Sequence, residues 1–554
     1  FGKRSNYSSQ KARPLLEDGK IPSIGRGDSN LDSESYGSIL RSTFKLKLTS
    51  SKEVDVSISA SALMVGKVRY DIRDIVGATI TKNGYVVHAY PKAAGGCCSS
   101  GGARSYKPIR LFCRDTDKSQ MWVTRICRFS RDLPPGSNPP AVRKMLCYVN
   151  PFSGTGSAPQ IMERARSMFL HAGIEPTVVE TKKANQVREE VAKLNLEAWD
   201  GVIIISGDGL VVEYINGIME REDWESAITR PFGVIPGGSG NGLVHSFNHV
   251  SGETVDETSS IFHILKGKTH ALDLLSYEVV SGAQSSSSVI VYGFLSLAWG
   301  LIADIDLNSE VIRCCGPARF TLWAIFRLCC SKSYQATLKY TPSREGNGKY
   351  GGSSNSREQG IHALKMLRNS EAIITDEPQS ASTNACSSGK NLKPIHEGLP
   401  SPAASAVAEE EEKKRPGSGR TNSTSMSETA TSKIFTLIYA SSTPRVSDEI
   451  LLAPKAKLDD GRIHLSYLEG SNCCSTLCGL LRLEDGSFET DPRFKSVQVD
   501  QFRVETDSKA APALYSLDGE RMDTSGSVTV RIHPKVLNVF CIGNEVGVFG
   551  NQNV

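Results

Sequence analysis

The stretch Val202–Gly209 reads VIIISGDG, and a second glycine-rich stretch, Pro236–Gly242, reads PGGSGNG. Each follows a short run of β-branched and aliphatic residues, so we predict two strands that deliver two glycine loops to the same end of one sheet. Glycine lacks a Cβ, and its backbone N–H groups therefore approach an anion closely where a helix begins. The two loops are typical of phosphate binding.

The two loops do not have the spacing of the common nucleotide motifs. Neither matches the Walker pattern GxxxxGK[ST] or the dinucleotide pattern GxGxxG. The first loop also places a carboxylate, Asp208, between two glycines, where a phosphate-binding loop normally avoids negative charge. A carboxylate in this position indicates acid–base chemistry or contact with a metal ion.

The composition sets limits on the class of protein. A chain of 554 residues predicts two to four domains, and 39% hydrophobic and 22% charged residues with a net charge of +4 describe a soluble globular protein that does not bind nucleic acid. The longest apolar stretch, 288–305, is interrupted by Ser296, Gly300 and Asp304, so we expect neither a signal peptide nor a transmembrane helix. Several of the fourteen cysteines are adjacent in pairs, which favours reduced thiols in a cytosolic protein over disulfides or zinc.

The N-terminal region divides into a tail and a β module. Residues 1–38 are polar and basic and predict a disordered tail. Within 39–132, short alternating strands are expected at 44–48, 54–58, 78–81, 85–89 and 110–113, followed by a helix over 119–129. This layout indicates a pleckstrin-homology-like (PH-like) module, although another kind of β domain fits equally well. The Pro-rich segment 133–140 separates it from the next region.

Residues 141–275 alternate strand and helix, which predicts a doubly wound α/β nucleotide-binding lobe with a parallel sheet. Ligands of such sheets gather at the carboxyl ends of the strands. Four segments fall at such ends, namely 150–156, 181, 206–209 and 236–242. We therefore expect these four segments to lie together on one edge of the sheet.

After residue 275 strand patterns dominate. We predict an antiparallel β-sandwich lobe formed by 276–341 and 433–554. The intervening residues 342–432 are rich in Ser, Gly, Glu and Asn and predict a disordered insertion with Ser and Thr sites for phosphorylation. The expected fold class is thus α/β plus all-β, preceded by the PH-like module.

Five segments together resemble the sphingosine kinases, within the wider diacylglycerol kinase catalytic family. They are NPFSGTG at Asn150, SGDGLVVEYINGIMEREDW at Ser206, PGGSGNGL at Pro236, LSLAWGLIADID at Leu295 and SLDGE at Ser516. The resemblance covers about 143–340 and 433–543, and the segment at Leu295 is the one that points to sphingoid bases. The β module ahead of these segments resembles the arrangement of plant-type members.

The resemblance implies a kinase that transfers the γ-phosphate of ATP, with Mg²⁺, to the primary hydroxyl of a sphingoid base. Asp208 is then the base that accepts the hydroxyl proton. The residues alone leave another interpretation open, because Asp is also a favoured N-cap and Asp208 would cap the helix that begins at Gly209.

Most of the implied nucleotide site lies in the α/β lobe. The loop at 150–156 contributes Asn150, Pro151 and Phe152, with Phe152 and Ser153 departing from the family's NPxGGxG. Asn241 is expected to cap the helix after the loop at 236–242. The further implied nucleotide residues are Thr181, Lys182, Lys183, Ala184, Asn185, Ser206, Gly207, Gly209, Glu213, Gly238, Ser239, Gly240, Arg313, Arg319, Asp518, Gly519 and Glu520. The metal ligands are left unassigned.

The resemblance places the lipid head group at the first glycine loop, Ser206–Gly209, beside Ser296 and Asp306. A carboxylate at Asp306 would select the protonated amine of a sphingoid base, with Asp304 as a substitute. The alkyl chain would run along apolar residues that include Leu295, Leu297, Leu301, Ile302, Phe320, Leu322 and Phe326.

The expected partners are the sphingoid base and a membrane surface, which the first module and the segment 323–328 would contact. The expected location is therefore cytoplasmic and peripherally membrane-associated, and a homodimer is left open. Two alternatives remain at this point: a ceramide or diacylglycerol kinase, which would not need Asp306, and a catalytically silent membrane-lipid adaptor.

Overall fold

The computed structural model describes residues 39–47, 49, 52–93, 102–134, 141–238, 240–280, 288–309, 311–312, 318–329, 334–343, 356–375, 429–448, 450–470, 473–506 and 513–543. The chain divides into two compact units, one of 1–87 with 109–141 and one of 88–108 with 142–554. The predicted tail, 1–38, lies outside the described residues.

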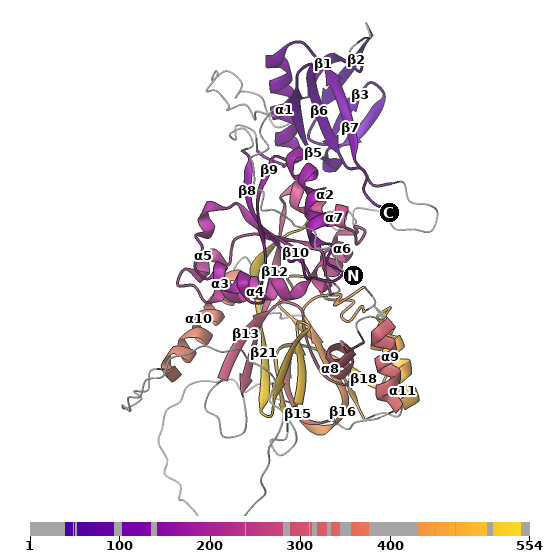
Figure 1. Ribbon diagram of the computed structural model, residues 1–554. Helices are drawn as coiled ribbons and strands as arrows, with labels where there is room; N and C mark the ends of the chain where they lie inside the picture. The colour runs from indigo at the N-terminus through magenta and orange to yellow at the C-terminus, as the bar shows by residue number, and fades with distance from the viewer. Residues whose placement is uncertain are drawn as a thin grey trace, which may run out of the picture. The chain divides into compact units, whose positions relative to one another are not determined.

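The first unit contains a seven-stranded antiparallel sheet in the order β4-β3-β2-β1-β7-β6-β5, with helix α1 (Thr116–Ser130) after the last strand (Figure 1). This agrees with the expected layout of antiparallel strands closed by one helix. Strands β3 and β4 had no counterpart in the prediction, because each is only four residues long. The strands are β1 (Leu40–Lys45), β2 (Glu53–Ile58), β3 (Ala62–Val65), β4 (Val68–Asp71), β5 (Ile75–Thr81), β6 (Gly84–Ala89) and β7 (Lys107–Phe112).

The predicted extent of the first module, 39–132, is wrong at one point. Residues 88–108 group with the second unit. Within that unit, Arg104 forms a buried ion pair with Glu253 at 2.8 Å, and Lys92 Nζ donates to the carbonyl oxygen of Gly252 at 2.9 Å. These long-range pairs cannot be read from local strand patterns.

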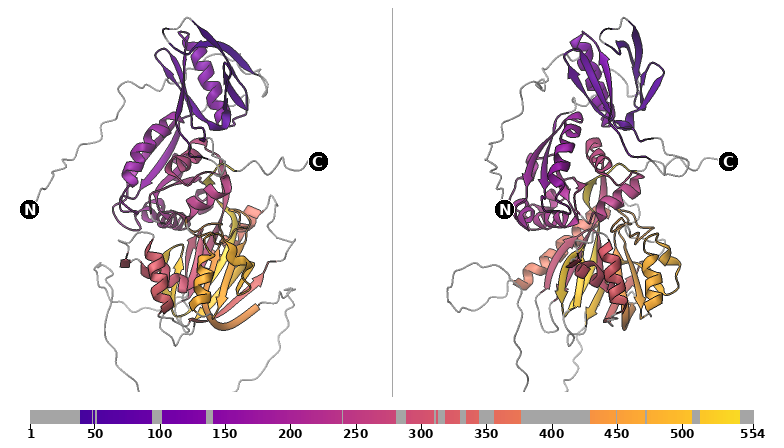
Figure 2. Two further views of the ribbon diagram at one scale, coloured as in Figure 1. Left: turned by 90° about the vertical axis from the view of Figure 1, so that its right-hand side faces the viewer. Right: turned by 45° about the vertical axis from the view of Figure 1, so that its right-hand side comes forward.

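The α/β lobe is built on four parallel strands in the order β9-β8-β10-β11: β8 (Arg143–Val149), β9 (Ile174–Glu180), β10 (Gly201–Ser206) and β11 (Phe232–Pro236). All six residues of β10 are buried, as expected for a central parallel strand. Helices cover both faces of this sheet (Figure 2). They are α2 (Ala158–His171), α3 (Gln186–Val191), α4 (Asp208–Met219), α5 (Trp224–Ala227), α6 (Gly242–Ser251) and α7 (Glu257–Lys266).

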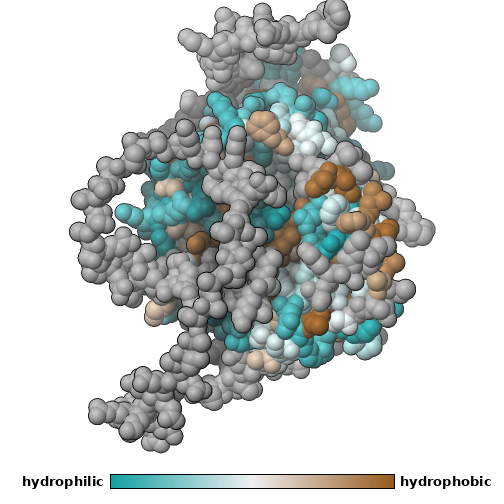
Figure 3. Space-filling view, turned by 60° about the horizontal axis from the view of Figure 1, so that its bottom comes forward, coloured by the Kyte–Doolittle hydropathy of each residue, from teal (hydrophilic) through white to brown (hydrophobic). Residues whose placement is uncertain are grey.

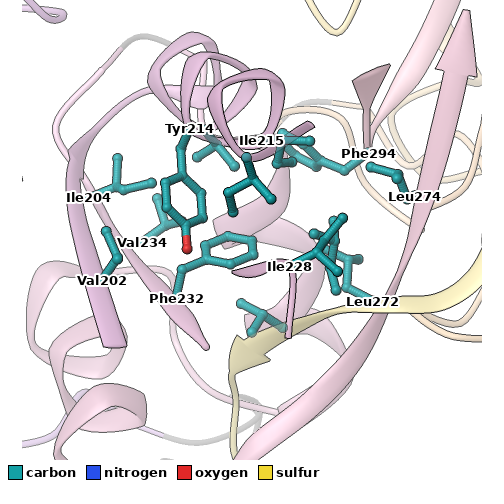
Figure 4. Close-up of a cluster of buried hydrophobic side chains, with 14 of the residues drawn as sticks. Val202, Ile204, Tyr214, Ile215, Ile228, Phe232, Val234, Leu272, Leu274 and Phe294 are labelled. Atoms are coloured by element: carbon teal, nitrogen blue, oxygen red, sulfur yellow. The ribbon is translucent and has the colours of Figure 1, made fainter. Parts of the chain in front are cut away.

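The core of this lobe holds the loops in place by fixing the strands and the helix between them. Tyr214 and Ile215 of α4 pack against Phe232 of β11, and the rings of Tyr214 and Phe232 are 5.6 Å apart (Figure 4). Val202 and Ile204 of β10 complete this cluster. Since Gly207 alone lies between β10 and α4, the packing of these two elements fixes the position of the loop at 206–209.

The sandwich lobe consists mainly of antiparallel strands, with the short helices α8 (Leu301–Asn308), α9 (Ala318–Cys329) and α11 (Cys473–Leu481). Its core includes Trp299, Tyr515 and Phe502. The predicted combination of an α/β lobe, a β-sandwich and an N-terminal β module is confirmed. The strands are β12 (Thr269–Val280), β13 (Ser288–Gly293), β14 (Ser296–Gly300), β15 (Tyr334–Pro342), β16 (Thr429–Ser441), β17 (Ile463–Glu469), β18 (Phe494–Thr506), β19 (Ala513–Leu517), β20 (Glu520–Thr524) and β21 (Ser527–Phe540).

The two lobes are joined by continuous strands. β21 pairs with β18 in the sandwich lobe, and farther along the chain its Val539 pairs with Phe232 of β11. β12 pairs antiparallel with β21 from Thr269 to Val280. The predicted boundary at 275/276 therefore falls inside one strand, because the same pair of strands serves both lobes.

The prediction that 342–432 is a disordered insertion is wrong in part, because residues 356–375 form helix α10 (Ser356–Thr375). Leu364 of α10 is fully buried in the core of the α/β lobe, and Arg357 Nη2 donates to the carbonyl oxygen of Val536 at 3.0 Å. Lys365 also forms an ion pair with Glu225 at 2.8 Å. Local polarity obscured this helix, whose stability comes from packing on β21. Residues 376–428 lie outside the described residues.

Among the residues described here, none of the helices is both long and apolar enough to cross a bilayer. Cys113, Cys127, Cys147, Cys473, Cys478 and Cys541 form no disulfide.

Replacing Leu364 by alanine is expected to lower the free energy of unfolding by about 2–4 kcal/mol, because a cavity opens where α10 meets the α/β core. Chemical denaturation of the full chain measures this change. Met366→Ala on the same helix is the matched control, since that side chain is 60% exposed, and it should change stability by less than about 0.5 kcal/mol. Equal effects of the two substitutions would contradict the packing role of α10.

Candidate active site

The three glycine loops of the α/β lobe meet backbone to backbone. A Cβ on Gly207 would lie 2.7 Å from the carbonyl oxygen of Gly240, and one on Gly238 would lie 2.6 Å from the Cα of Gly207. Gly154 has a φ of +54°, and a Cβ there would lie 2.9 Å from the carbonyl oxygen of Gly237. Contacts this short exclude any side chain, so glycine is required at these positions. The structure thus brings the predicted loops together at the carboxyl ends of β8, β10 and β11.

Ser153 connects the loop at 150–156 to the loop at 206–209. Its Oγ accepts a hydrogen bond from the Gly207 N–H at 3.1 Å and lies 3.3 Å from Ser206 Oγ, which donates to it. The neighbouring Phe152 is 72% exposed, while its N–H donates to Asn150 Oδ1 at 3.0 Å. Ser153, which departs from the family pattern, therefore has a structural role, and the Phe152 side chain faces solvent.

Asp208 begins helix α4, but its side chain caps a different helix. The Gly242 N–H donates to Asp208 Oδ2 at 2.6 Å and the Leu243 N–H to Oδ1 at 3.3 Å, so the carboxylate lies at the N-terminus of α6. The alternative in which Asp208 caps the helix that begins at Gly209 is wrong. Asn241 occupies the N-cap position of α6, as predicted, but its side chain makes no capping hydrogen bond, because its Nδ2 donates to the carbonyl oxygen of Gly238.

Burial and hydrogen bonding shift the pKa of Asp208 in opposite directions. Burial raises its pKa to about 6, the two amide hydrogen bonds from Gly242 and Leu243 act to lower it, and the negative charge of Asp518 adds to the rise. A carboxylate with this pKa is ionised at neutral pH and retains a useful affinity for a proton. These are the properties of a general base that works near pH 7.

Glu213 holds the segment that follows β9. Its carboxylate accepts hydrogen bonds from the N–H of Asn185 at 2.9 Å and of Val187 at 3.2 Å, at the N-terminus of α3. Asn185 itself has a φ of +61° and makes no side-chain cap. Glu213 therefore fixes the position of residues 181–185, which include Lys182, Lys183 and Ala184. Thr181, where this segment starts, is buried and pairs with β8 through its N–H.

Asp518 is buried and accepts four hydrogen bonds. The donors are Tyr277 Oη at 2.6 Å and the backbone N–H groups of Phe294 at 2.7 Å, Leu295 at 3.1 Å and Ser296 at 2.8 Å. Because protein donors occupy both oxygens, this carboxylate positions the site and is not placed to receive a nucleotide directly. It ties the β19–β20 turn to the start of β14.

The turn at Asp518 brings Glu520 to the α/β lobe. A Cβ on Gly209 would lie 2.7 Å from Glu520 Oε1, so the glycine of the first loop leaves room for this carboxylate. Glu520 is solvent-exposed, yet partial burial and the negative charges of Glu213, Asp518 and Asp306 raise its pKa. Carboxylates from both lobes thus share one electrostatic environment. Gly519 supplies the positive φ, +84°, that this turn needs.

The implied amine site lies on α8. Asp306 Oδ2 accepts a hydrogen bond from Ser516 Oγ at 2.7 Å, and the charge of Asp306, after burial, raises the pKa of Tyr439. Asp304 forms an ion pair with Arg327 at 2.6 Å and accepts a hydrogen bond from Asn308 Nδ2 at 2.6 Å. The structure therefore excludes Asp304 as the substitute, since its charge is already neutralised.

The remaining predicted residues are distributed as follows. Ser239 and Arg313 lie outside the described residues. Arg319 is buried on α9, with its guanidinium 4.5 Å from the Phe320 ring centre. Within the part of the chain that the structure describes, no group of three or more His, Cys, Asp or Glu forms a complete metal site.

Sequence reasoning missed three residues that build the site, namely Tyr277, Ser516 and Tyr439. Tyr277 on β12 donates to Asp518, Ser516 on β19 donates to Asp306, and Tyr439 on β16 is affected by the charge of Asp306. The pairing of β14 with β16 and β19 places Tyr439 and Ser516 on either side of Ala298. Ser516 directly precedes the LDGE turn, which was the one available signal.

Comparisons with known proteins identify relatives of both lobes. Residues 144–277 match the family described as the diacylglycerol kinase catalytic domain, and residues 423–541 match the YegS C-terminal NAD kinase beta sandwich-like domain. Sphingosine kinase 1 of Arabidopsis thaliana is 28% identical over 81% of this chain and 82% of its own length. Sphingosine kinase 1 of Mus musculus is 30% identical over 72% of this chain and 91% of its own length. Sphingosine kinase 1 of Homo sapiens is 30% identical over 71% of this chain and 89% of its own length.

Fold and site define a lipid kinase with a diacylglycerol kinase catalytic domain and a β-sandwich lobe. The chain belongs to the sphingosine kinase family and is an ATP-dependent kinase of sphingoid bases. The expectation drawn from the five quoted segments is confirmed.

Asp518→Asn should destabilise the second unit by about 2–4 kcal/mol, because an amide nitrogen would face backbone N–H donors in a buried place. Thermal and chemical denaturation measure the loss. Asp448→Asn is the control, since the Asp448 side chain is 85% exposed. Retention of wild-type stability in Asp518→Asn would contradict the positioning role given to this carboxylate.

Proposed function

We propose that the chain transfers the γ-phosphate of ATP to the primary hydroxyl of sphingosine or a related long-chain base, with Asp208 as the general base. The observation that carries this proposal is a buried carboxylate with a pKa of about 6 at the junction of the glycine loops. In the step itself, the lipid oxygen bonds to the γ-phosphorus, the bond from that phosphorus to the bridging oxygen breaks, and ADP leaves. The hydroxyl proton passes to Asp208.

The nucleotide phosphates would lie on the backbone N–H groups of the loops at 150–156, 206–209 and 236–242. The adenosine would lie along residues 181–185, which Glu213 holds in place. Magnesium would be held here by Glu520, whose pKa is raised by burial and by the negative charges of Glu213, Asp518 and Asp306. In phosphoryl transfer Mg²⁺ is held mainly by the phosphates with one or two carboxylates, and it neutralises charge on them.

We assign recognition of the lipid amine to Asp306. Ser516 fixes the orientation of this carboxylate by donating a hydrogen bond to it. Tyr439 interacts both with the charge of Asp306 and with the side chain of Ser296. The backbone N–H of Ser296 is held by Asp518. The apolar side chains next to this polar group include Ala298, Ile302 and Leu437. An amphiphile with a cationic head and one alkyl chain matches a carboxylate bordered by apolar side chains.

The enzyme would meet its substrate at a bilayer, which fits a cytoplasmic, peripherally membrane-associated protein. Exposed apolar side chains gather on α9 and α11, where Leu322, Ile325, Phe326, Leu477 and Leu481 are 39–66% exposed. The space-filling view shows hydrophobic surface on the side that carries these helices (Figure 3). An exposed apolar patch of this kind marks a contact with a membrane or a partner. Leu322 and Phe326 would thus contact lipid from the surface.

The pH dependence of kcat/KM tests the role of Asp208. Only the ionised carboxylate accepts a proton, so activity on sphingosine should be full above pH 7 and fall about tenfold per pH unit below a midpoint near 6. Asp208→Asn should lower kcat by about 10²–10⁴-fold at pH 7.5. The asparagine oxygen still accepts from the Gly242 N–H, while its amide nitrogen faces the Leu243 N–H, so the melting temperature is measured alongside. Loss of activity in a variant that is still folded at the assay temperature separates lost catalysis from lost folding. Wild-type activity in this variant would remove Asp208 from the mechanism.

Asp306→Asn tests amine recognition. Loss of the charge that meets the ammonium should reduce kcat/KM for sphingosine by about 30–100-fold. Any residual phosphorylation of diacylglycerol, which has no cation, should stay within about twofold of wild type. Parallel assays with the two lipids in the same micelles measure the difference. An equal loss for both lipids would assign Asp306 to folding or catalysis instead.

A further inference from the structure

Three turns of the N-terminal module lie on one edge of its sheet. Lys45 pairs with Glu53 at the β1–β2 connection, and the Gly66 N–H donates to the Asp55 carbonyl oxygen at 2.8 Å, which places the β3–β4 turn at the same end. Lys45 also pairs with Phe112 at the end of β7. The neighbouring Cys113 N–H donates to the carbonyl oxygen of Asn83 in the β5–β6 turn at 3.0 Å. We call this the turn edge, formed by four segments: the described residues of the β1–β2 connection (46–47, 49 and 52), 66–69, 82–83 and 113–114.

Cations are concentrated on the turn edge. Lys47, Lys67, Lys82 and Arg114 are exposed there, one from each of the four segments, and Lys52 and Arg69 lie beside them. Among the described residues, none of the ion pairs involves these first four side chains. The acidic residues nearby are Glu53, Asp55, Asp115 and Asp117, of which Asp115 caps α1 by accepting from the Lys118 N–H. Cations therefore outnumber the carboxylates at this end.

The charge of the module differs from that of the remaining chain. Residues 39–87 and 109–132 contain 14 Lys and Arg against 7 Asp and Glu, a net charge of +7, whereas the whole chain carries +4. The rest of the chain is therefore slightly acidic. Such asymmetry favours an anionic partner for this unit in particular.

Two apolar side chains project between the cations. Leu46 is 44% exposed in the β1–β2 connection, and Val68 is 49% exposed where β4 begins. Both positions belong to the turn edge, next to Lys47 and Lys67. Lysines and arginines around exposed aliphatic side chains are typical of surfaces that rest on a membrane interface, because the aliphatic groups enter the lipid while the cations stay at the head groups.

We propose that the turn edge docks the enzyme on bilayers rich in anionic phospholipids. Each cation near such a surface contributes to binding, and Leu46 and Val68 add a hydrophobic contribution that is independent of salt. The docking rests on the proposed function, in which the substrate is presented in a bilayer. A nucleic acid would also be attracted by the cations, but it would leave Leu46 and Val68 without a partner.

The test compares two charge-matched variants of the full chain. Lys47→Gln/Lys67→Gln/Lys82→Gln removes three cations from the turn edge, and Arg41→Gln/Arg73→Gln/Arg110→Gln removes three exposed cations elsewhere in the module. Cosedimentation uses vesicles of phosphatidylcholine with about one-fifth phosphatidylserine. We expect the first variant to bind about 10–100-fold more weakly than wild type and the second within about threefold of wild type. Equal losses in both variants, or wild-type binding in the first, would overturn the proposal.

Two further measurements separate the contributions. Leu46→Ser/Val68→Ser should weaken vesicle binding while leaving its salt dependence unchanged, whereas the triple lysine variant should flatten the salt dependence. Wild-type binding that is equal on pure phosphatidylcholine vesicles, or stronger to a DNA duplex than to the anionic vesicles, would also overturn the proposal.

Phosphorylation of sphingosine in detergent micelles serves as the reference for all variants. We expect it to stay within about twofold of wild type, since the turn edge is outside the catalytic unit. Failure of the wild type in this assay would reject the proposed function, while normal activity without vesicle binding would reject the docking alone.

Discussion

The site depends on one buried carboxylate, that of Asp518, and the four hydrogen bonds it accepts. A charge removed from water is costly unless donors surround it, and Tyr277 with three successive backbone N–H groups supplies them. This arrangement fixes the turn that carries Glu520 and the strand that begins at Ser296. A segment near the end of the sequence thereby becomes part of a site whose loops come from its middle.

Backbone contact between glycines is the second constraint. Gly154, Gly207 and Gly238 approach so closely that a single Cβ would separate the loops, and Gly209 admits Glu520 from the other lobe. The packed core of β10, β11 and α4 keeps the loops at this distance. The same closeness positions Asp208 at the N-terminus of α6, where two amide N–H groups partly compensate its burial and leave its pKa near neutrality.

The sequence presented helix capping and proton transfer as alternative roles of Asp208. Its carboxylate caps α6 and not the helix that it begins, so the proposed proton transfer is compatible with capping by the same side chain. In the same way, Glu213 caps α3 and thereby holds the segment proposed to border the adenosine. Two carboxylates at helix N-termini, those of Asp208 and Glu213, thus hold the segments of the α/β lobe that surround the proposed site.

The sequence alone determined the alternation of strands and helices in the α/β lobe, the glycine loops at the strand ends, the β-sandwich and the family, because these follow from local periodicity and from short motifs. It failed for α10, for residues 88–108 and for the cap of α6, since a buried Leu364, the Arg104–Glu253 pair and the Asp208–Gly242 bond all join residues distant in sequence. Only the tertiary structure decided that Asp304 is neutralised by Arg327 while Asp306 is held by Ser516. The two carboxylates are two residues apart on one helix, and nothing local distinguishes them. Helix α9 brings Arg327 to Asp304, and strand β19 brings Ser516 to Asp306.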